Sequence, residues 1–166
     1  MATRPTVRRP LRKAAVVLAL CVWAEAACAQ DAGPIVLPDP SQDVPLGEAE
    51  LLAAFTDRTH RGTYTFKRPK IETFAFEERT TADGRTVHRH GDKTDRGTWR
   101  VRANVICFDY EDWDARGGRH LACFNIFKQG NCFYHYGLRL GQPGMGGFTA
   151  RTVHKGDEPD CEPPIA

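Results

Sequence analysis

The chain of 166 residues contains one serine, Ser41, and no catalytic motif that stands out from its surroundings. Nucleophilic catalysis by serine or cysteine needs a histidine within reach of the nucleophile. Ser41 falls in a proline-rich stretch, and the cysteines are expected to be paired in disulfides. The sequence therefore indicates no catalytic residue and favours a protein that is not an enzyme.

The sequence also lacks an apolar run that could cross a membrane, which takes about 20 residues. The apolar run at residues 14–22 is far shorter than this. It follows a basic segment at residues 8–13 and precedes a small-x-small pattern at residues 27–29. This order is typical of a cleaved signal peptide. We expect residues 1–29 to be removed and the mature protein to be periplasmic or secreted.

Two features of this leader concern the route of export. Arg8 and Arg9 resemble a twin-arginine signal, but Leu11 stands where phenylalanine is commoner, so the general secretory route is favoured. Cys28 is the residue that a lipoprotein signal would modify. Such a signal needs an aliphatic residue three positions earlier, where Glu25 stands, so the sequence favours a protein without a lipid anchor.

The charge of the chain also changes when the leader is removed. The full chain has 23 basic and 21 acidic residues, a net charge of +2. Residues 1–29 hold five basic residues and one acidic residue, which leaves 18 basic and 20 acidic residues and a net charge of −2. A mildly acidic domain lacks the basic footprint of a nucleic-acid-binding protein.

Four cysteines remain in the mature chain, namely Cys107, Cys123, Cys132 and Cys161. Cysteines of exported domains tend to pair, and four cysteines allow three pairings. Four free thiols in one cluster would instead imply a metal site, but Cys123 and Cys132 lie too far apart for a zinc knuckle. We therefore expect two disulfides.

The mature chain has the length of one domain with its own core. Residues 30–45 contain four prolines and little apolar periodicity, which predicts a linker. Residues 46–55 are the one expected helix, with acidic residues in the first turn and Leu51, Leu52 and Phe55 at helical spacing. We expect the folded domain to span residues 46–166.

From residue 62 onward the pattern changes to the alternation typical of β-strands. Turn signals such as Asp83-Gly84 separate neighbouring strands. The expected strands lie at residues 63–66, 71–78, 85–90, 97–101, 105–110, 121–127, 132–138 and 148–153. This order predicts a mostly all-β fold, an antiparallel meander of about eight strands. Such a meander forms a curled sheet or a small lipocalin-like barrel, because closure removes the sheet edges.

The hairpin at residues 105–127 also bears on the disulfides. If its loop centres near Ala115, Cys107 and Cys123 lie opposite each other on neighbouring strands, close enough for a bridge. Cys132 then pairs with Cys161 by elimination, which would tie the tail to the sheet. The sequence alone leaves the two other pairings open.

Three segments of the chain carry a family resemblance. Residues 97–101 (GTWRV), 105–108 (VICF) and 123–127 (CFNIF) resemble small exported bacterial proteins grouped as domain-of-unknown-function family 995. The resemblance extends over about residues 46–140. It implies an envelope-associated, β-rich domain with a cross-strand cysteine pair, and it supplies no catalytic residue.

His88 and His90 are the candidate metal ligands. They are two residues apart on an expected strand, so both imidazoles project from one face. Together with His120, His135 or His154 they could bind copper or zinc. The favoured alternative is a polar strand that faces solvent.

Acidic residues suggest two further sites. A calcium loop that begins at Asp112 would need an oxygen ligand at its fifth position, which is Arg116, so the EF-hand spacing fails. Paired carboxylates, such as Glu72 with Glu77 or Asp109, would suit a small hydrolase. Nothing in the sequence distinguishes these carboxylates from ordinary surface charge.

Most of the many aromatic residues are expected in the core. If the barrel is hollow, its interior would hold one apolar ligand, with Trp99, Tyr110 and Tyr136 as candidate ligand-binding residues. The favoured alternative is a short barrel that these rings fill.

These patterns favour an exported, non-enzymatic β-barrel domain that binds a small or envelope-derived ligand, or a protein partner. The alternatives are a carboxylate-dependent hydrolase acting on envelope polysaccharide and histidine-based metal binding. We expect no cofactor, no nucleic-acid partner and no membrane span, and the sequence does not indicate an oligomeric state.

Overall fold

The computed structural model describes residues 37–65, 75–112, 118–138 and 145–161. The expected signal peptide at residues 1–29 lies outside these ranges. The described chain contains one helix and eight strands: α1 (Glu48–Phe55), β1 (Thr59–Tyr64), β2 (Ala75–Thr80), β3 (Arg85–His90), β4 (Lys93–Arg102), β5 (Val105–Tyr110), β6 (His120–Gln129), β7 (Cys132–Leu138) and β8 (Met145–His154).

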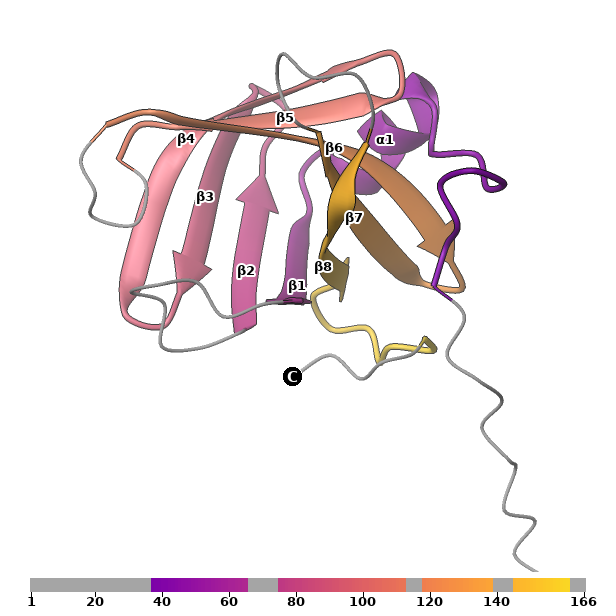
Figure 1. Cartoon of the computed structure of the whole chain (residues 1–166). Coiled ribbons are helices and arrows are strands. Elements are labelled where there is room, and N and C mark those ends of the chain that lie inside the picture. Colours follow the sequence, from indigo (N-terminus) through magenta and orange to yellow (C-terminus); the bar gives the residue numbers. More distant parts are fainter. Residues whose placement is uncertain (1–36, 66–74, 113–117, 139–144, 162–166) are drawn as a thin grey trace, which may run out of the picture. The chain divides into compact units, whose positions relative to one another are not determined.

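The strands form one closed antiparallel barrel in which each strand pairs with its neighbours in the sequence (Figure 1). The barrel is closed by β8 and β1, where His60 pairs with His154 and Tyr64 with Ala150. Closure satisfies the backbone groups that an open sheet would leave at its edges. The predicted meander of about eight strands is confirmed, and the barrel, not an open curled sheet, is the form it takes.

The strand at residues 97–101 was predicted too short, because β4 begins at Lys93. A tight turn joins β3 to β4, with Gly91 at a φ of 57° and His90 paired with Lys93. Residues 93–96 are all polar, and Lys93 and Asp95 are of types that are depleted in strands. Their pairing with β3 overrides that propensity, as tertiary context commonly does in sheets.

Helix α1 packs against one end of the barrel (Figure 1). Leu51 and Phe55 are fully buried. The Phe55 carbonyl oxygen accepts a hydrogen bond from the Thr80 hydroxyl, and the Ala54 carbonyl oxygen lies 3.1 Å from His60 Nε2. The helix therefore fixes the floor of the barrel interior. Its apolar side chains share one core with residues of four strands, namely Trp99, Ile106, Phe108, Tyr110, Ile126 and Phe133.

A second apolar cluster involves β6, β7 and β8 and contains Phe127, Cys132, Tyr134, Tyr136 and Val153. The Tyr136 hydroxyl donates a hydrogen bond of 2.6 Å to the carbonyl oxygen of Pro38, which is buried. This bond attaches the described part of the expected linker, residues 37–45, to the barrel.

We expect Tyr136→Phe to lower the free energy of unfolding by about 1–2 kcal/mol, because the buried Pro38 carbonyl loses its hydrogen-bond donor while the ring remains. Urea unfolding measures the change. Thr65→Val, which removes an exposed hydroxyl that bonds to the Phe148 and Thr149 carbonyls, is the control, with an expected change below about 0.5 kcal/mol. Equal losses in the two variants would mean that residues 37–45 are not held by Tyr136.

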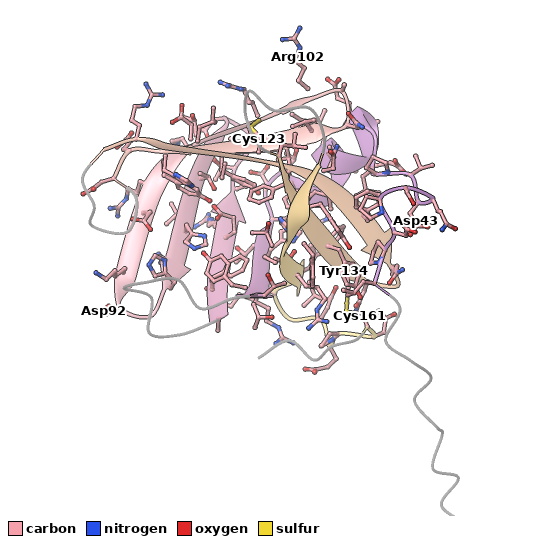
Figure 2. The ribbon with its side chains drawn as sticks, in the orientation of Figure 1. Asp43, Asp92, Arg102, Cys123, Tyr134 and Cys161 are labelled. Atoms are coloured by element: carbon pink, nitrogen blue, oxygen red, sulfur yellow. A yellow bond between two sulfur atoms is a disulfide. The ribbon has the colours of Figure 1, made fainter. Side chains whose placement is uncertain are left out.

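The four cysteines form the two expected disulfides, Cys107–Cys123 and Cys132–Cys161 (Figure 2). Cys107 and Cys123 are directly opposite each other in the β5–β6 register, with 4.1 Å between their Cα atoms. The predicted cross-strand bridge is confirmed. Within the described residues, no helix is long and apolar enough to cross a membrane.

Candidate binding pocket inside the barrel

Polar side chains line part of the barrel interior, on β2 and β3. The alternation of these strands places Glu78 and Thr80 on the buried face of β2, and Thr86, His88 and His90 on the buried face of β3. All five residues are at most 5% exposed. Buried polar groups need hydrogen-bond partners, so this interior must contain a network.

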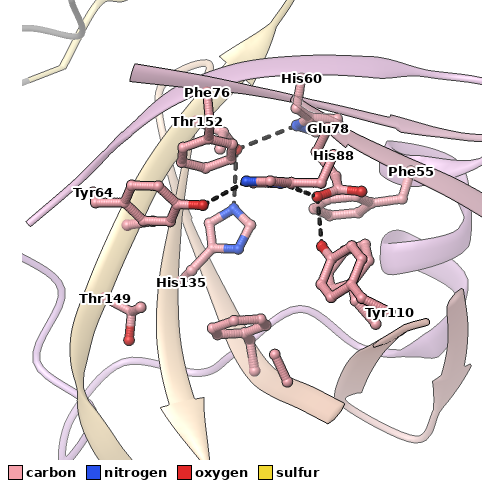
Figure 3. A pocket seen from close by; sticks show the side chains of 14 residues that line it. Phe55, His60, Tyr64, Phe76, Glu78, His88, Tyr110, His135, Thr149 and Thr152 are labelled. Carbon is pink, nitrogen blue, oxygen red and sulfur yellow. Dashed lines mark hydrogen bonds and ion pairs between the residues drawn. The ribbon is translucent and has the colours of Figure 1, made fainter. Parts of the chain in front are cut away.

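Glu78 is the centre of the network (Figure 3). Its Oε1 accepts a hydrogen bond from the Thr86 hydroxyl. Its Oε2 lies 2.6 Å from both the Tyr110 hydroxyl and His88 Nδ1. Glu78 thus accepts from three donors on β3 and β5, as a carboxylate does.

His88 links this carboxylate to Tyr64. Because Nδ1 faces the carboxylate of Glu78, Nδ1 carries the imidazole proton and Nε2 accepts from the Tyr64 hydroxyl, 2.5 Å away. Phe76 stacks on both rings, with centroids 4.5 Å from Tyr64 and 5.0 Å from His88. The result is an ordered chain of carboxylate, imidazole and phenol.

A second chain runs through His60, Thr152 and His135. The Ala54 carbonyl oxygen only accepts, so His60 Nε2 carries the proton and Nδ1 accepts from the Thr152 hydroxyl at 3.2 Å. The Thr152 oxygen then accepts from His135 Nε2 at 3.0 Å. Burial lowers the pKa of His60, and also that of His135, from 6.5 to about 3. Both imidazoles are therefore neutral at physiological pH.

A small cavity lies between the two chains. Its lining includes Phe76, Phe108 and Phe124 as well as Tyr64 and Tyr110. The space open to the centre of a water-sized molecule is about 40 Å³, and the whole empty space, open solvent at its mouth included, is about 480 Å³. One water molecule needs about 10–15 Å³, so the first of these spaces takes about three. Side chains fill most of the barrel, and only a small chemical group fits inside.

Of the three candidate ligand-binding residues, only Tyr110 lines this pocket. Trp99 belongs to the core beside α1, where its Nε1 donates to the Thr81 carbonyl at 2.9 Å. Tyr136 belongs to the cluster of β6, β7 and β8 and bonds to Pro38. Tyr136 is next to His135 on β7 and therefore lies on the opposite face of the strand from His135, which lines the pocket.

The expectation of a solvent-facing strand at His88 and His90 is wrong, because both residues face the barrel interior. His90 Nδ1 lies 3.7 Å from the buried carboxylate of Asp95. Among the described residues, no group of three or more histidine, cysteine or acidic side chains is placed to hold a metal ion. The metal-site hypothesis gains no support from this part of the chain.

The carboxylates of the hydrolase hypothesis lie elsewhere. Glu77 pairs with Lys155 at 2.7 Å. Asp109 pairs with Arg119, whose side chain is mostly exposed. Glu72 lies outside the described residues. The two described carboxylates therefore belong to surface ion pairs and not to the pocket.

Sequence reasoning missed four residues of the two chains, namely Glu78, Tyr64, His60 and Thr152, and it named His135 only as a possible metal ligand. One signal was available, since Glu78 is two residues from Phe76 and so shares its strand face. The contacts across the barrel had no such signal, because they join strands distant in the sequence, as His60 and Thr152 do.

No family model, curated protein or solved structure gave a significant match to the chain. The interpretation of function therefore depends on the geometry of the pocket.

Proposed function

We propose that this is an exported binding protein whose barrel interior receives a small polar group of an envelope-derived or other small ligand. The observation that carries the proposal is the Tyr64 hydroxyl, which lies on the pocket wall at the end of the Glu78–His88 chain. Ligand pockets commonly combine an apolar, aromatic lining with a few convergent polar groups. The lining of this pocket has that composition.

The position of the pocket supports entry from one end of the barrel. Helix α1 packs against the end at which β1 begins, and Phe55 forms part of the pocket lining there. Tyr64 is the last residue of β1 and therefore lies toward the opposite end, whereas Tyr110 belongs to the core beside α1. A ligand would place its polar group between these tyrosines and leave the remainder at the mouth.

Phenol is a suitable probe, because its hydroxyl is small and its ring resembles the rings of the lining. At ten times its dissociation constant, phenol should stabilise the protein by about 1.4 kcal/mol. This raises Tm by about 3–6 °C. Ala122→Leu fills the pocket from β6 and should abolish the shift. Ala53→Leu makes the same change on the exposed face of α1 and should retain it.

Native mass spectrometry of protein isolated from a periplasmic extract complements this test. A retained small molecule that Ala122→Leu loses would support binding in the pocket. A clean apo mass, together with no shift by phenol, would contradict the proposal and favour a protein partner instead.

A further inference from the structure

The polar groups of the pocket follow the order of a nucleophile, its base and the group that orients the base. Tyr64 Oη lies 2.5 Å from His88 Nε2, and His88 Nδ1 lies 2.6 Å from Glu78 Oε2. All three residues are at most 8% exposed. The same order and the same distances characterise activated nucleophiles in covalent catalysis.

We propose that Tyr64 is a nucleophile toward small carboxylic esters, with His88 as its base and Glu78 as the group that holds the base in place. The inference rests on the proposed function, because the acyl group must enter the same cavity. The acyl group would be a small one such as acetyl, because the cavity has room for only a few water-sized groups.

The reaction has two halves that use the same groups. Tyr64 Oη attacks the carbonyl carbon while its proton passes to His88 Nε2. The bond between the carbonyl carbon and the alcohol oxygen breaks, and the departing alcohol takes that proton. Water then attacks the acyl-tyrosine in the same way, which releases the carboxylic acid and restores the phenol. The carboxylate of Glu78 remains beside the transient imidazolium and stabilises it.

The contacts of Tyr110 and Tyr136 make both hydroxyls poorer nucleophiles than that of Tyr64. Tyr110 donates directly to Glu78, so its phenolate would face a carboxylate of like charge. Tyr136 donates to the Pro38 carbonyl, which cannot take up a proton. Burial also raises the pKa of Tyr136. The Tyr64 hydroxyl, by contrast, bonds to an imidazole, which can take up the phenolic proton.

Phe76 is a positioning residue for this arrangement. Its ring lies 25° from the plane of Tyr64 and 29° from the plane of His88. One stacked ring thus limits the rotation of both partners and keeps Oη on the side of Nε2. The chain through His60, Thr152 and His135 has no carboxylate at either described end, so it lacks the group that would stabilise a protonated imidazole.

Methanesulfonyl fluoride tests the proposal, because it is small and reacts with activated hydroxyls. Tyr64 Oη would bond to sulfur, the sulfur–fluorine bond would break, and fluoride would leave while His88 takes the phenolic proton. Peptide mapping of the full-length purified protein should find the label on Tyr64. His88→Gln should slow labelling at least about 100-fold, since it removes the base. Tyr136→Phe, the matched control, should leave the rate unchanged.

Two measurements keep the test decisive if His88→Gln is unstable. In the wild-type protein, Tyr64 should react at least about 100-fold faster than Tyr110 in the same pocket. Phenol, which occupies the same cavity, should also protect Tyr64 from labelling. Equal labelling of the two tyrosines, or no label on either, would overturn the proposal. If phenol still raises Tm in that case, binding stands and only the reactivity fails.

Discussion

Acidification from pH 7 to pH 4 should unfold this protein or bring it close to unfolding. His60 and His135 have pKa values of about 3 in the folded barrel, because burial disfavours their charged forms. In the unfolded chain both titrate near 6.5. The unfolded state therefore binds more protons between pH 6.5 and pH 3, and stability falls as the pH falls through this window. Each histidine contributes about 1.4 kcal/mol per pH unit.

The size of this effect is large compared with the stability of a domain. Over about 2.5 pH units below 6.5, two such histidines remove about 7 kcal/mol. Total stabilities of small domains are about 5–15 kcal/mol. Well above pH 6.5 both residues are neutral in the folded and the unfolded states, so they give stability no pH dependence there.

Urea unfolding at pH 7, 6, 5 and 4 measures the slope. His60→Gln and His135→Gln should each reduce the slope of stability against pH by about 1.4 kcal/mol per pH unit, the contribution of one bound proton. Glutamine retains polar atoms but does not titrate. His120→Gln is the matched control, since His120 is only partly buried at the start of β6. A slope that is the same in His60→Gln, His135→Gln and the wild type would show that these imidazoles are not the groups that titrate.

The strands of the barrel could be predicted because local signals agree with the fold. The Asp83-Gly84 turn lies between β2 and β3, with Gly84 at a φ of 81°. β3, β5 and β7 have the predicted bounds. These elements depend on alternation and turn chemistry, which a single sequence displays. β4 was harder, since its first residues are strands only through their pairing with β3.

The pocket could not be predicted in the same way. Alternation indicates which residues share a strand face, but it does not indicate which face is buried when both carry polar residues. On β3, Arg85 and Arg89 lie on one face and His88 and His90 on the other, so neither face is apolar. Only barrel closure makes the histidine face internal. The contact of Tyr64 with His88 crosses from β1 to β3 and has no local signature.

The cluster of β6, β7 and β8 shows a related limit. Tyr134 and Tyr136 are buried although they lie on the face of β7 opposite to the pocket residue His135. Segments near both ends of the described chain reach this cluster, as Pro38 and Cys161 do. Irregular segments of this kind have no periodicity, so the alternation of β7 did not indicate what covers this face of the strand.

Removal of either disulfide should reduce stability substantially. Cys107 and Cys123 are 16 residues apart, and Cys132 and Cys161 are 29 residues apart. On the chain-entropy model, loops of these lengths correspond to about 3 and about 3.5 kcal/mol. The loss acts mainly through the unfolded chain, which gains freedom once a bridge is removed. Loss of both bridges would remove about as much stability as many domains possess.

The described residues after β8, up to Cys161, test whether the loss acts through the unfolded chain, because the Cys132–Cys161 bridge is not their only attachment to the barrel. Asp160 Oδ1 accepts from the Asn131 backbone amide at 2.7 Å, and Asn131 Oδ1 accepts from the Asp160 amide at 3.1 Å. The folded tail should therefore stay in place in Cys161→Ser. Most of the loss in the free energy of unfolding should then come from the unfolded state. In the reduced protein, the backbone amides of Asn131 and Asp160 should still be protected from hydrogen exchange.

Double-mutant cycles on each cysteine pair test which cysteines are bonded and how much stability each bridge contributes. Cys107→Ser and Cys123→Ser should each lower the free energy of unfolding by about 3 kcal/mol, and the double variant should lose no more than either single variant, because one cysteine alone cannot form the bridge. The same equality should hold for Cys132 and Cys161. The pair Cys107 and Cys132 is the control, and its losses should add, because each belongs to a different bridge. Additive losses within Cys107 and Cys123 would mean that they are not partners, and the β5–β6 register would have to be revised with them.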